Sequence, residues 1–201
     1  IFAIAACGGN INKISSVYDL RCESLQDPLG IDKTVPRFSW KIQSQKNGTT
    51  QKAYQVVVAS DKSKLSEKKA DLWNSGKTDS SESLFVPYQG KPLSSGSEAW
   101  WTVRIWDETG KASAWSKPAR FTIGLLDEKE WKASYITFNS ENGYRECPQV
   151  FSTIEVDKTK ATYLLHVNSL GYHEVYINGE KVGDKVLAPA VSQFDKRSLV
   201  V

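Results

Sequence analysis

The sequence has few of the side chains that most often serve metal centres and nucleophilic catalysis. Its 201 residues include two histidines, His166 and His173, and three cysteines, Cys7, Cys22 and Cys147. None of them falls at the spacing of a metal-ligand cluster, and no Ser or Cys nucleophile pattern accompanies either histidine. The sequence therefore indicates no metal site, and we expect structural or surface roles for both histidines.

So few cysteines do not form a disulfide framework of the kind that small secreted domains use. An exported protein could pair Cys22 with Cys147, but the two lie in different predicted domains. We therefore expect both to be buried free thiols.

The sequence also has no large excess of charge of one sign and no long apolar run. The formal net charge is only +3, and no basic stretch is interleaved with aromatic residues, so nucleic-acid binding is not indicated. Residues 61–71 carry four lysines around Leu65 and predict a solvated loop or short helix. No segment approaches the roughly 20 apolar residues of a transmembrane helix, so we expect membrane attachment through a lipid anchor only.

Methionine is absent throughout, and we therefore expect translation to start upstream of Ile1. Residues 4–7, Ile-Ala-Ala-Cys, resemble a bacterial lipoprotein box, in which Cys7 becomes the acylated first residue of the mature protein. The alternative is a hydrophobic end with an incidental cysteine. The lipobox is favoured because the apolar run stops at Cys7 and a polar Gly-Gly-Asn follows. Residues 1–16 are thus predicted to be a signal-peptide remnant, lipobox and tether of an exported protein, lipid-anchored in the bacterial envelope and facing the periplasm or the cell surface.

Strand-like alternation is the main pattern that the sequence does have. The centre of this pattern is the segment 99–106, in which one face carries Ala99, Trp101, Val103 and Ile105. Residues 107–110 end in Gly and predict a turn, and the return arm is expected to begin near Ala114. We expect the indoles of this hairpin to be buried against the rest of the chain, because each covers on the order of 200 Å².

The preceding residues predict the remaining strands of a sandwich. Phe38, Trp40 and Ile42 alternate inward, and Trp40 is the candidate centre of the core. Strands are predicted over 17–22, 37–42, 53–60, 72–77 and 83–88. About seven strands within residues 17–124 predict an immunoglobulin-like two-sheet sandwich.

A second β domain is predicted over residues 130–201, because residues 124–131 break the alternation. The Asn178-Gly179 pair after 172–177 is a strong hairpin signal, with a return over 181–183. Further strands are expected over 150–156, 161–167 and 194–201. The last would leave an unpaired edge, so we expect this domain to be incomplete by itself.

The hairpin carries a first resemblance. Leu93, the alternating strand, Asp-x-x-Gly, Ser-Ala-Trp-Ser and a closing Phe-Thr resemble strands F and G of a fibronectin type III domain. Such domains place a Tyr six residues after the Leu. Ala99 holds that position here, and we expect Trp100 or Trp101 to fill the space.

Two ordered sets of motifs carry a second resemblance. The first set comprises residues 20–23, 28–32, 36–40, 53–55, 72–77 and 124–126, and the second comprises residues 170–179, 182–184, 187–189 and 194–197. In this order they resemble the N-terminal fibronectin-like domain and the following jelly-roll module of bacterial alpha-L-rhamnosidases of glycoside hydrolase family 78. The resemblance implies an all-β chain, in which a fibronectin type III-like sandwich (17–124) precedes a truncated jelly roll (130–201).

The resemblance also implies the function. Enzymes of this family release terminal L-rhamnose with inversion, through acid and base carboxylates in a downstream (α/α)6 barrel. This sequence shows no long helical region, so no catalytic residue is assigned, and Glu174 is expected at the rim of a sandwich strand. The implied role is to support the catalytic domain, with a rhamnose-containing glycan as partner of the parent enzyme. Alternatives are a stand-alone carbohydrate-binding or adhesion lipoprotein, and a structural spacer.

Some family members hold a terminal rhamnose beside calcium in the jelly roll. The residue types for such a site are an aromatic platform and paired polar groups. They are offered here by Tyr172, Tyr176, Asn178, Asp184 and Asp195. The competing interpretation is that Asn178 serves its turn and the tyrosines serve strand packing. Calcium is the only cofactor that this resemblance suggests.

Overall fold

The computed structural model of the chain describes residues 14–45, 47–136, 149–159, 163–184 and 186–188. The chain divides into two compact units, residues 1–130 and 131–201, and each is described by itself. All regular pairing in the described residues is antiparallel β, and the helices there are two short 3-10 turns, η1 (Lys62–Lys64) and η2 (Glu128–Glu130). The all-β prediction is confirmed.

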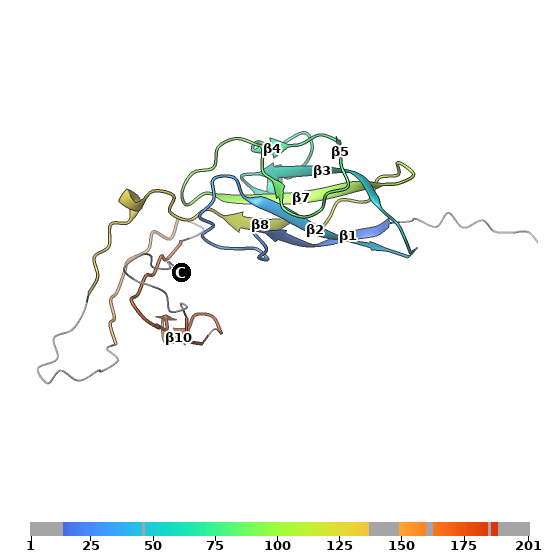
Figure 1. Ribbon diagram of the computed structural model, residues 1–201. Coiled ribbons are helices and arrows are strands. Elements are labelled where there is room, and N and C mark those ends of the chain that lie inside the picture. Colours follow the sequence, from blue (N-terminus) through green and yellow to red (C-terminus); the bar gives the residue numbers. More distant parts are fainter. Residues whose placement is uncertain (1–13, 46, 137–148, 160–162, 185, 189–201) are drawn as a thin grey trace, which may run out of the picture. The chain divides into compact units, whose positions relative to one another are not determined.

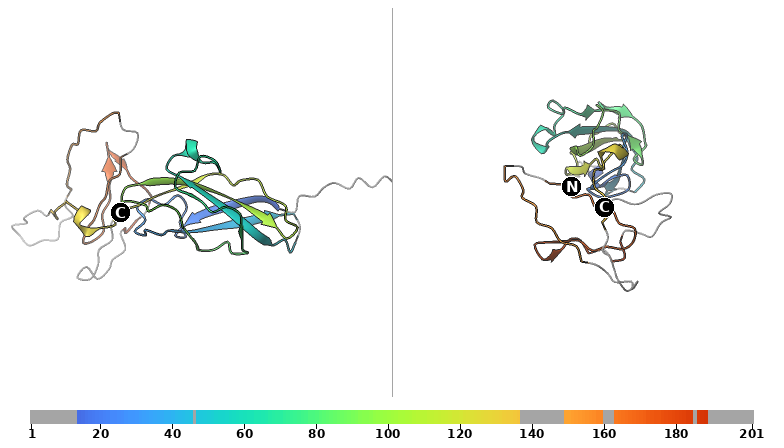
Figure 2. Two further views of the ribbon diagram at one scale, coloured as in Figure 1. Left: turned by 90° about the horizontal axis from the view of Figure 1, so that it is seen from above. Right: turned by 90° about the vertical axis from the view of Figure 1, so that its left-hand side faces the viewer.

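The first unit is a sandwich of two sheets (Figures 1 and 2). The smaller sheet has the order β1-β2-β6, from β1 (Ile14–Cys22), β2 (Arg37–Ser44) and β6 (Val86–Pro87). The larger sheet has the order β4-β3-β7-β8, with β5 also pairing with β3. Its strands are β4 (Trp73–Asn74), β3 (Gln51–Ala59), β5 (Thr78–Asp79), β7 (Glu98–Asp107) and β8 (Ala119–Thr122). The strands predicted over 72–77 and 83–88 are thus reduced to two-residue pairings, and β5 was not predicted.

The core forms between the inner faces of the two sheets. The predicted inward face of β7, Ala99, Trp101, Val103 and Ile105, is fully buried, as alternation along a strand requires. Trp40 is also buried, and its Nε1 donates to Gln51 Oε1 at 3.0 Å. Its predicted place in the core is confirmed.

Aromatic rings join the two sheets at Phe38. The Phe38 ring centroid lies 4.4 Å from that of Trp101 and 5.7 Å from that of Phe121. The rings are tilted, which aromatic pairs prefer over a face-to-face sandwich. Cys22 is buried as predicted, and burial raises the pKa of its thiol. Cys147 lies outside the described residues.

The return arm of the hairpin differs from the prediction. Strand β8 begins at Ala119 rather than near Ala114. Before it, serine hydroxyls take the place of a regular ladder: Ile105 N donates to Ser113 Oγ and Val103 N donates to Ser116 Oγ, both at 3.1 Å. The N–H groups of Ile105 and Val103 thus bond to side-chain hydroxyls, while their carbonyls accept from Ser113 N and Ser116 N. Hydrophobic alternation does not reveal such a pairing.

The position expected for a corner tyrosine is occupied by buried Ala99, and Trp101 lies in the core beside Phe38. A backbone-binding phenol comes instead from Tyr88, whose hydroxyl donates to Lys91 O at 2.8 Å and lies 3.4 Å from Leu72 O. The Tyr88 hydroxyl thus links the backbone at Leu72 to the backbone at Lys91.

In the second unit, β9 (Tyr176–Ile177) and β10 (Glu180–Lys181) form the hairpin predicted from Asn178-Gly179. Both turn residues have positive φ, 52° and 87°, as a type I′ turn requires. The strands predicted over 150–156 and 161–167 do not form in the described residues, and Phe151 is 95% exposed. A strand needs a hydrogen-bonded neighbour, and the described residues provide none there. The strand predicted over 194–201 lies outside the described residues.

Gly90 allows a close approach of backbone segments beside Tyr88. A Cβ there would lie 2.5 Å from both Leu72 O and Tyr88 Oη. We expect Gly90→Ala to lower the free energy of unfolding by about 1–3 kcal/mol, the usual cost of overpacking. Chemical denaturation measures this. Gly171→Ala is the control, since a Cβ there meets no atom within 4 Å; an equal loss in both variants would contradict the prediction.

A carboxylate on the bulged strand β1 gives a second test. Asp19 accepts from Lys41 Nζ at 2.7 Å, Arg21 Nε at 3.0 Å and Gln26 Nε2 at 2.8 Å. These contacts, with Lys41 contributing most, lower the pKa of Asp19 from 3.8 to about 2. Because the folded pKa is depressed, the stabilisation is present above pH of about 4 and is lost as the pH falls towards 2.

We expect Asp19→Asn to be less stable than the wild type at neutral pH, with the difference closing as the pH falls from about 4 to about 2. Denaturant titrations at several pH values measure the difference. Asp32→Asn is the control, because that carboxylate is 82% exposed and lies 3.9 Å from Lys33. A difference for Asp19→Asn that does not change with pH would refute the assignment.

Candidate functional site

The outward side chains of β7 form the most distinctive surface of the first unit. Trp100, Arg104 and Trp106 are half-buried there, and Thr102 is buried among them. Because every second residue of a strand faces the same side, they lie in one row on the outer face of the larger sheet. The predicted burial of the hairpin indoles against the rest of the chain is therefore complete for Trp101 and only partial for Trp100 and Trp106.

Cations cover the outer indoles instead. Arg104 Cζ lies 4.9 Å from the ring centroid of Trp106 and 4.7 Å from that of Trp115. Lys77 Nζ lies 5.1 Å from Trp106, and Lys62 Nζ lies 5.2 Å from Trp100. Long cationic side chains thus cover apolar rings while keeping their charge near water.

Arg104 is held in place by neighbours on two other segments. Its Nη2 donates to Gln55 Oε1 at 2.9 Å and forms an ion pair with Glu67 Oε1. Gln55 in turn donates to Asn74 Oδ1 at 2.8 Å, and Asn74 Nδ2 donates to Glu67 O at 3.0 Å. These bonds fix the segment around Glu67 against the sheet.

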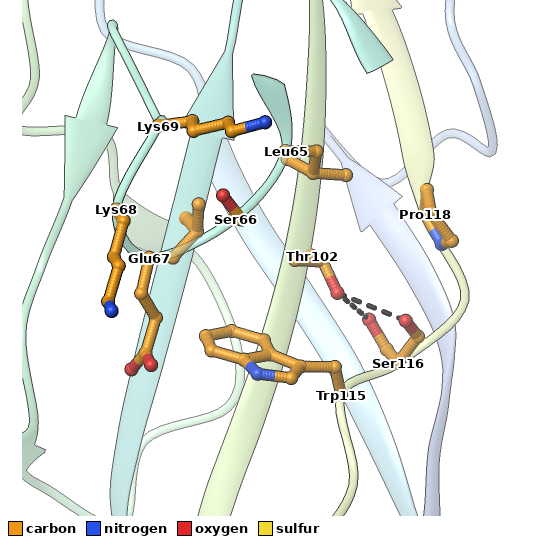
Figure 3. Close-up of a pocket in the computed structure, with 10 residues that line it drawn as sticks. Leu65, Ser66, Glu67, Lys68, Lys69, Thr102, Trp115, Ser116 and Pro118 are labelled. Atoms are coloured by element: carbon orange, nitrogen blue, oxygen red, sulfur yellow. Dashed lines mark hydrogen bonds between the residues drawn. The ribbon is translucent and has the colours of Figure 1, made fainter. Parts of the chain in front are cut away.

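A groove of about 480 Å³ lies between this segment and Trp115 (Figure 3). Figure 3 shows the Trp115 indole pointing towards Glu67, with Ser116 and Pro118 on the same side as the Trp115 backbone. Thr102 Oγ1 lies 3.0 Å from both Ser116 O and Ser116 Oγ, so the Thr102 and Ser116 hydroxyls maintain the strand pairing. The groove is lined by Val57, Leu65, Ser66, Glu67, Lys68, Lys69, Thr102, Trp115, Ser116 and Pro118.

Sequence reasoning did not find this groove. Residues 61–71 were predicted to be a solvated loop or short helix, which is confirmed: the segment contains η1, and all four of its lysines are exposed. The signal that could have indicated it is the second face of β7, which reads Trp-x-Thr-x-Arg-x-Trp. Two tryptophans on a face that contacts only water would be unusual, so this row indicates that other side chains cover it.

The residues predicted for sugar binding in the second unit are only partly brought together. Tyr176 and Asn178 share the β9–β10 hairpin, and Asn178 occupies the turn. Tyr172 and Tyr176 are 55% and 56% exposed, and Asp184 is exposed. Asp195 lies outside the described residues. Sugar or calcium binding at this place stays a prediction.

Glu174 is engaged by its neighbours on the same hairpin. Tyr176 Oη donates to Glu174 Oε2 at 2.8 Å, and Lys181 forms an ion pair with Glu174 Oε1. Lys181 contributes most to lowering the pKa of Glu174, and the hydrogen bond from Tyr176 to Glu174 raises the pKa of Tyr176. A general acid needs the opposite shift.

Among the described residues, His173 takes part in a local hydrogen-bonded contact. His173 Nδ1 lies 2.7 Å from Ser169 Oγ, and Ser169 Oγ donates to Gly171 O at 2.6 Å, a local contact within one loop. Within the described ranges, no three His, Cys, Asp or Glu side chains gather as a metal site would require. The same ranges contain no helix long and apolar enough to cross a membrane.

Comparisons with known proteins identify both units. Residues 17–127 match the family model of the Rha78A-like N-terminal immunoglobulin domain, and residues 157–201 match that of the alpha-L-rhamnosidase N-terminal domain. An alpha-L-rhamnosidase of Formosa agariphila is 40% identical over 87% of this chain and 21% of its own length. One from Alteromonas sp. (strain LOR) is 33% identical over 98% of this chain and 22% of its own length.

Solved structures of alpha-L-rhamnosidases are also similar to this chain. The alpha-L-rhamnosidase from Dictyoglumus thermophilum has a TM-score of 0.73 and 29% identity, over 96% of this chain and 23% of that one. The Streptomyces avermitilis alpha-L-rhamnosidase complexed with L-rhamnose has a TM-score of 0.56 and 42% identity, over 59% of this chain and 11% of that one. The chain spans about a fifth of the length of the first two curated relatives. It belongs to the family of Rha78A-like N-terminal immunoglobulin domains, joined here to an alpha-L-rhamnosidase N-terminal domain.

Proposed function

We propose that this chain is the non-catalytic N-terminal part of an alpha-L-rhamnosidase that hydrolyses terminal alpha-L-rhamnose from glycans or glycosides. The observation that carries the proposal is the succession, within one chain, of both N-terminal modules of these enzymes, at 17–127 and 157–201. The proposed role is to support and orient a downstream catalytic domain.

Four described carboxylates have pKa shifts opposite to those of a general acid. Inverting hydrolysis needs a carboxylic acid with a raised pKa and a carboxylate base about 6.5–9.5 Å from it. Arg37 lowers the pKa of Glu23, and Lys64 lowers that of Asp71. Asp19 and Glu174 are likewise shifted downwards by cationic partners. Such groups are fixed as anions, which suits surface ion pairs rather than proton donation.

Hydrolysis of para-nitrophenyl alpha-L-rhamnoside by the full-length gene product, beside this chain, tests the proposal. We expect nitrophenolate release by the full-length protein and none by the chain, because the acid and base are proposed to lie downstream. The matching beta-D-glucoside is the control substrate. A folded full-length protein that leaves the rhamnoside intact would overturn the proposal in favour of a carbohydrate-binding or adhesion protein.

We further propose that the protein is exported and lipid-anchored at Cys7. The support is the sequence Ile-Ala-Ala-Cys at residues 4–7 and the polar Gly-Gly-Asn that follows. Stable anchoring needs more than one acyl chain, which a lipoprotein cysteine supplies.

For the protein expressed from its own gene in its bacterial host, we expect partition into the detergent phase on Triton X-114 extraction and a mass that lacks residues 1–6. Cys7→Ser is expected to move the protein to the aqueous phase, while Cys22→Ser, at a buried thiol, is expected to leave the partition unchanged. Native protein that retains residues 1–6 would contradict the anchor.

A further inference from the structure

We propose that the groove between Trp115 and residues 65–69 is a binding subsite for a pyranose ring of a glycan. The choice of a carbohydrate over another small ligand rests on the proposed function, whereas the existence of the subsite rests on the geometry of the first unit alone.

Trp115 provides the aromatic platform. A pyranose presents a patch of C–H groups that packs on an indole face, and Trp115 lines the groove half-buried rather than in the core. Trp106, on the same face of the sheet, is covered by both Arg104 and Lys77. Among the described residues, one cation lies over Trp115: Arg104, whose guanidinium stacks on the indole and holds it in place.

Polar groups with free hydrogen-bonding capacity lie on the other side of the groove. Lys69 Nζ and Ser66 Oγ make no hydrogen bond within the described ranges, and the ion pair with Arg104 uses only Oε1 of Glu67. Together they offer a cationic donor, a hydroxyl and a carboxylate oxygen, the groups that neighbouring sugar hydroxyls pair with.

The groove has a suitable size and a fixed frame. Its volume of about 480 Å³ lies within the range of roughly 300–1,000 Å³ that small-molecule sites occupy. Its loop wall is held by Lys64 Nζ at 2.7 Å from Asp71 Oδ2 and by Lys69 N donating to Ser66 O at 3.2 Å. A site ordered before binding loses less entropy when the ligand arrives.

The test is a titration of the 201-residue chain, with tryptophan indole N–H groups followed by NMR. The probes are methyl alpha-L-rhamnopyranoside and an alpha-L-rhamnosyl disaccharide. We expect a saturable shift of the Trp115 signal. Trp115→Ala, whose binding is followed by isothermal titration calorimetry because it lacks the reporting indole, is expected to raise the dissociation constant about tenfold, which corresponds to roughly 1.4 kcal/mol.

Two further variants separate binding from folding. Trp106→Ala removes an outer indole that also stacks on Arg104 but does not line the groove, and it is expected to bind like the wild type. Ser66→Trp, at an exposed loop position, is expected to fill the groove and abolish binding while leaving the unfolding transition unchanged.

The absence of any saturable shift at Trp115, or equal affinities of the wild type and Ser66→Trp, would overturn the subsite. Either result would leave hydrolysis by the full-length protein unaffected, because binding is read from the chain itself. Failure of the rhamnoside assay with a positive titration would instead retain the subsite and remove the rhamnosidase assignment.

Discussion

The contact between Phe38 and Trp101 is the interaction on which the first unit depends. It joins the smaller sheet to the larger one at a centroid separation of 4.4 Å, and both rings are fully buried. Burying two large aromatic side chains removes several hundred Å² from water, a larger gain than any surface ion pair of the unit provides. The Trp40–Gln51 hydrogen bond satisfies the indole N–H of Trp40, whereas the buried Nε1 of Trp101 has no hydrogen-bond partner within the described residues, so Trp101 contributes through its apolar area.

This core could be predicted from the sequence because it follows from period-two alternation. Local alternation was enough to predict the inward positions of β7 and of Trp40 on β2. The Asn178-Gly179 turn could be predicted as well, because these residues tolerate positive φ. The start of β8 was not readable. There the backbone of β7 bonds to the hydroxyls of Ser113 and Ser116, a pairing that leaves no hydrophobic period.

The outer face of the larger sheet shows a second limit of pattern reasoning. Trp100 and Trp106 were expected to be buried against the rest of the chain, but they are only half-buried, and cations from separate segments cover them. Which lysine or arginine reaches which indole depends on strand register and loop path, and neither is encoded by the spacing within one strand. The groove beside Trp115 was missed for the same reason, because residues 65–69 and 115–118 are far apart in sequence and are brought together only by the sheet.

Arg104 links the buried core of the sandwich to the outer face of the larger sheet. It projects from the strand that also carries Trp101, so the burial of Trp101 fixes the backbone from which Arg104 reaches Trp115 and Glu67. The Trp115 indole therefore packs on a side chain whose backbone is fixed by the core. An aromatic ring held in one orientation before binding loses little side-chain conformational entropy when a ligand binds. Strand β7 thus has two roles in this module. Its inner side chains pack in the core and stabilise the sandwich, and its outer side chains form a fixed, partly exposed aromatic and polar surface.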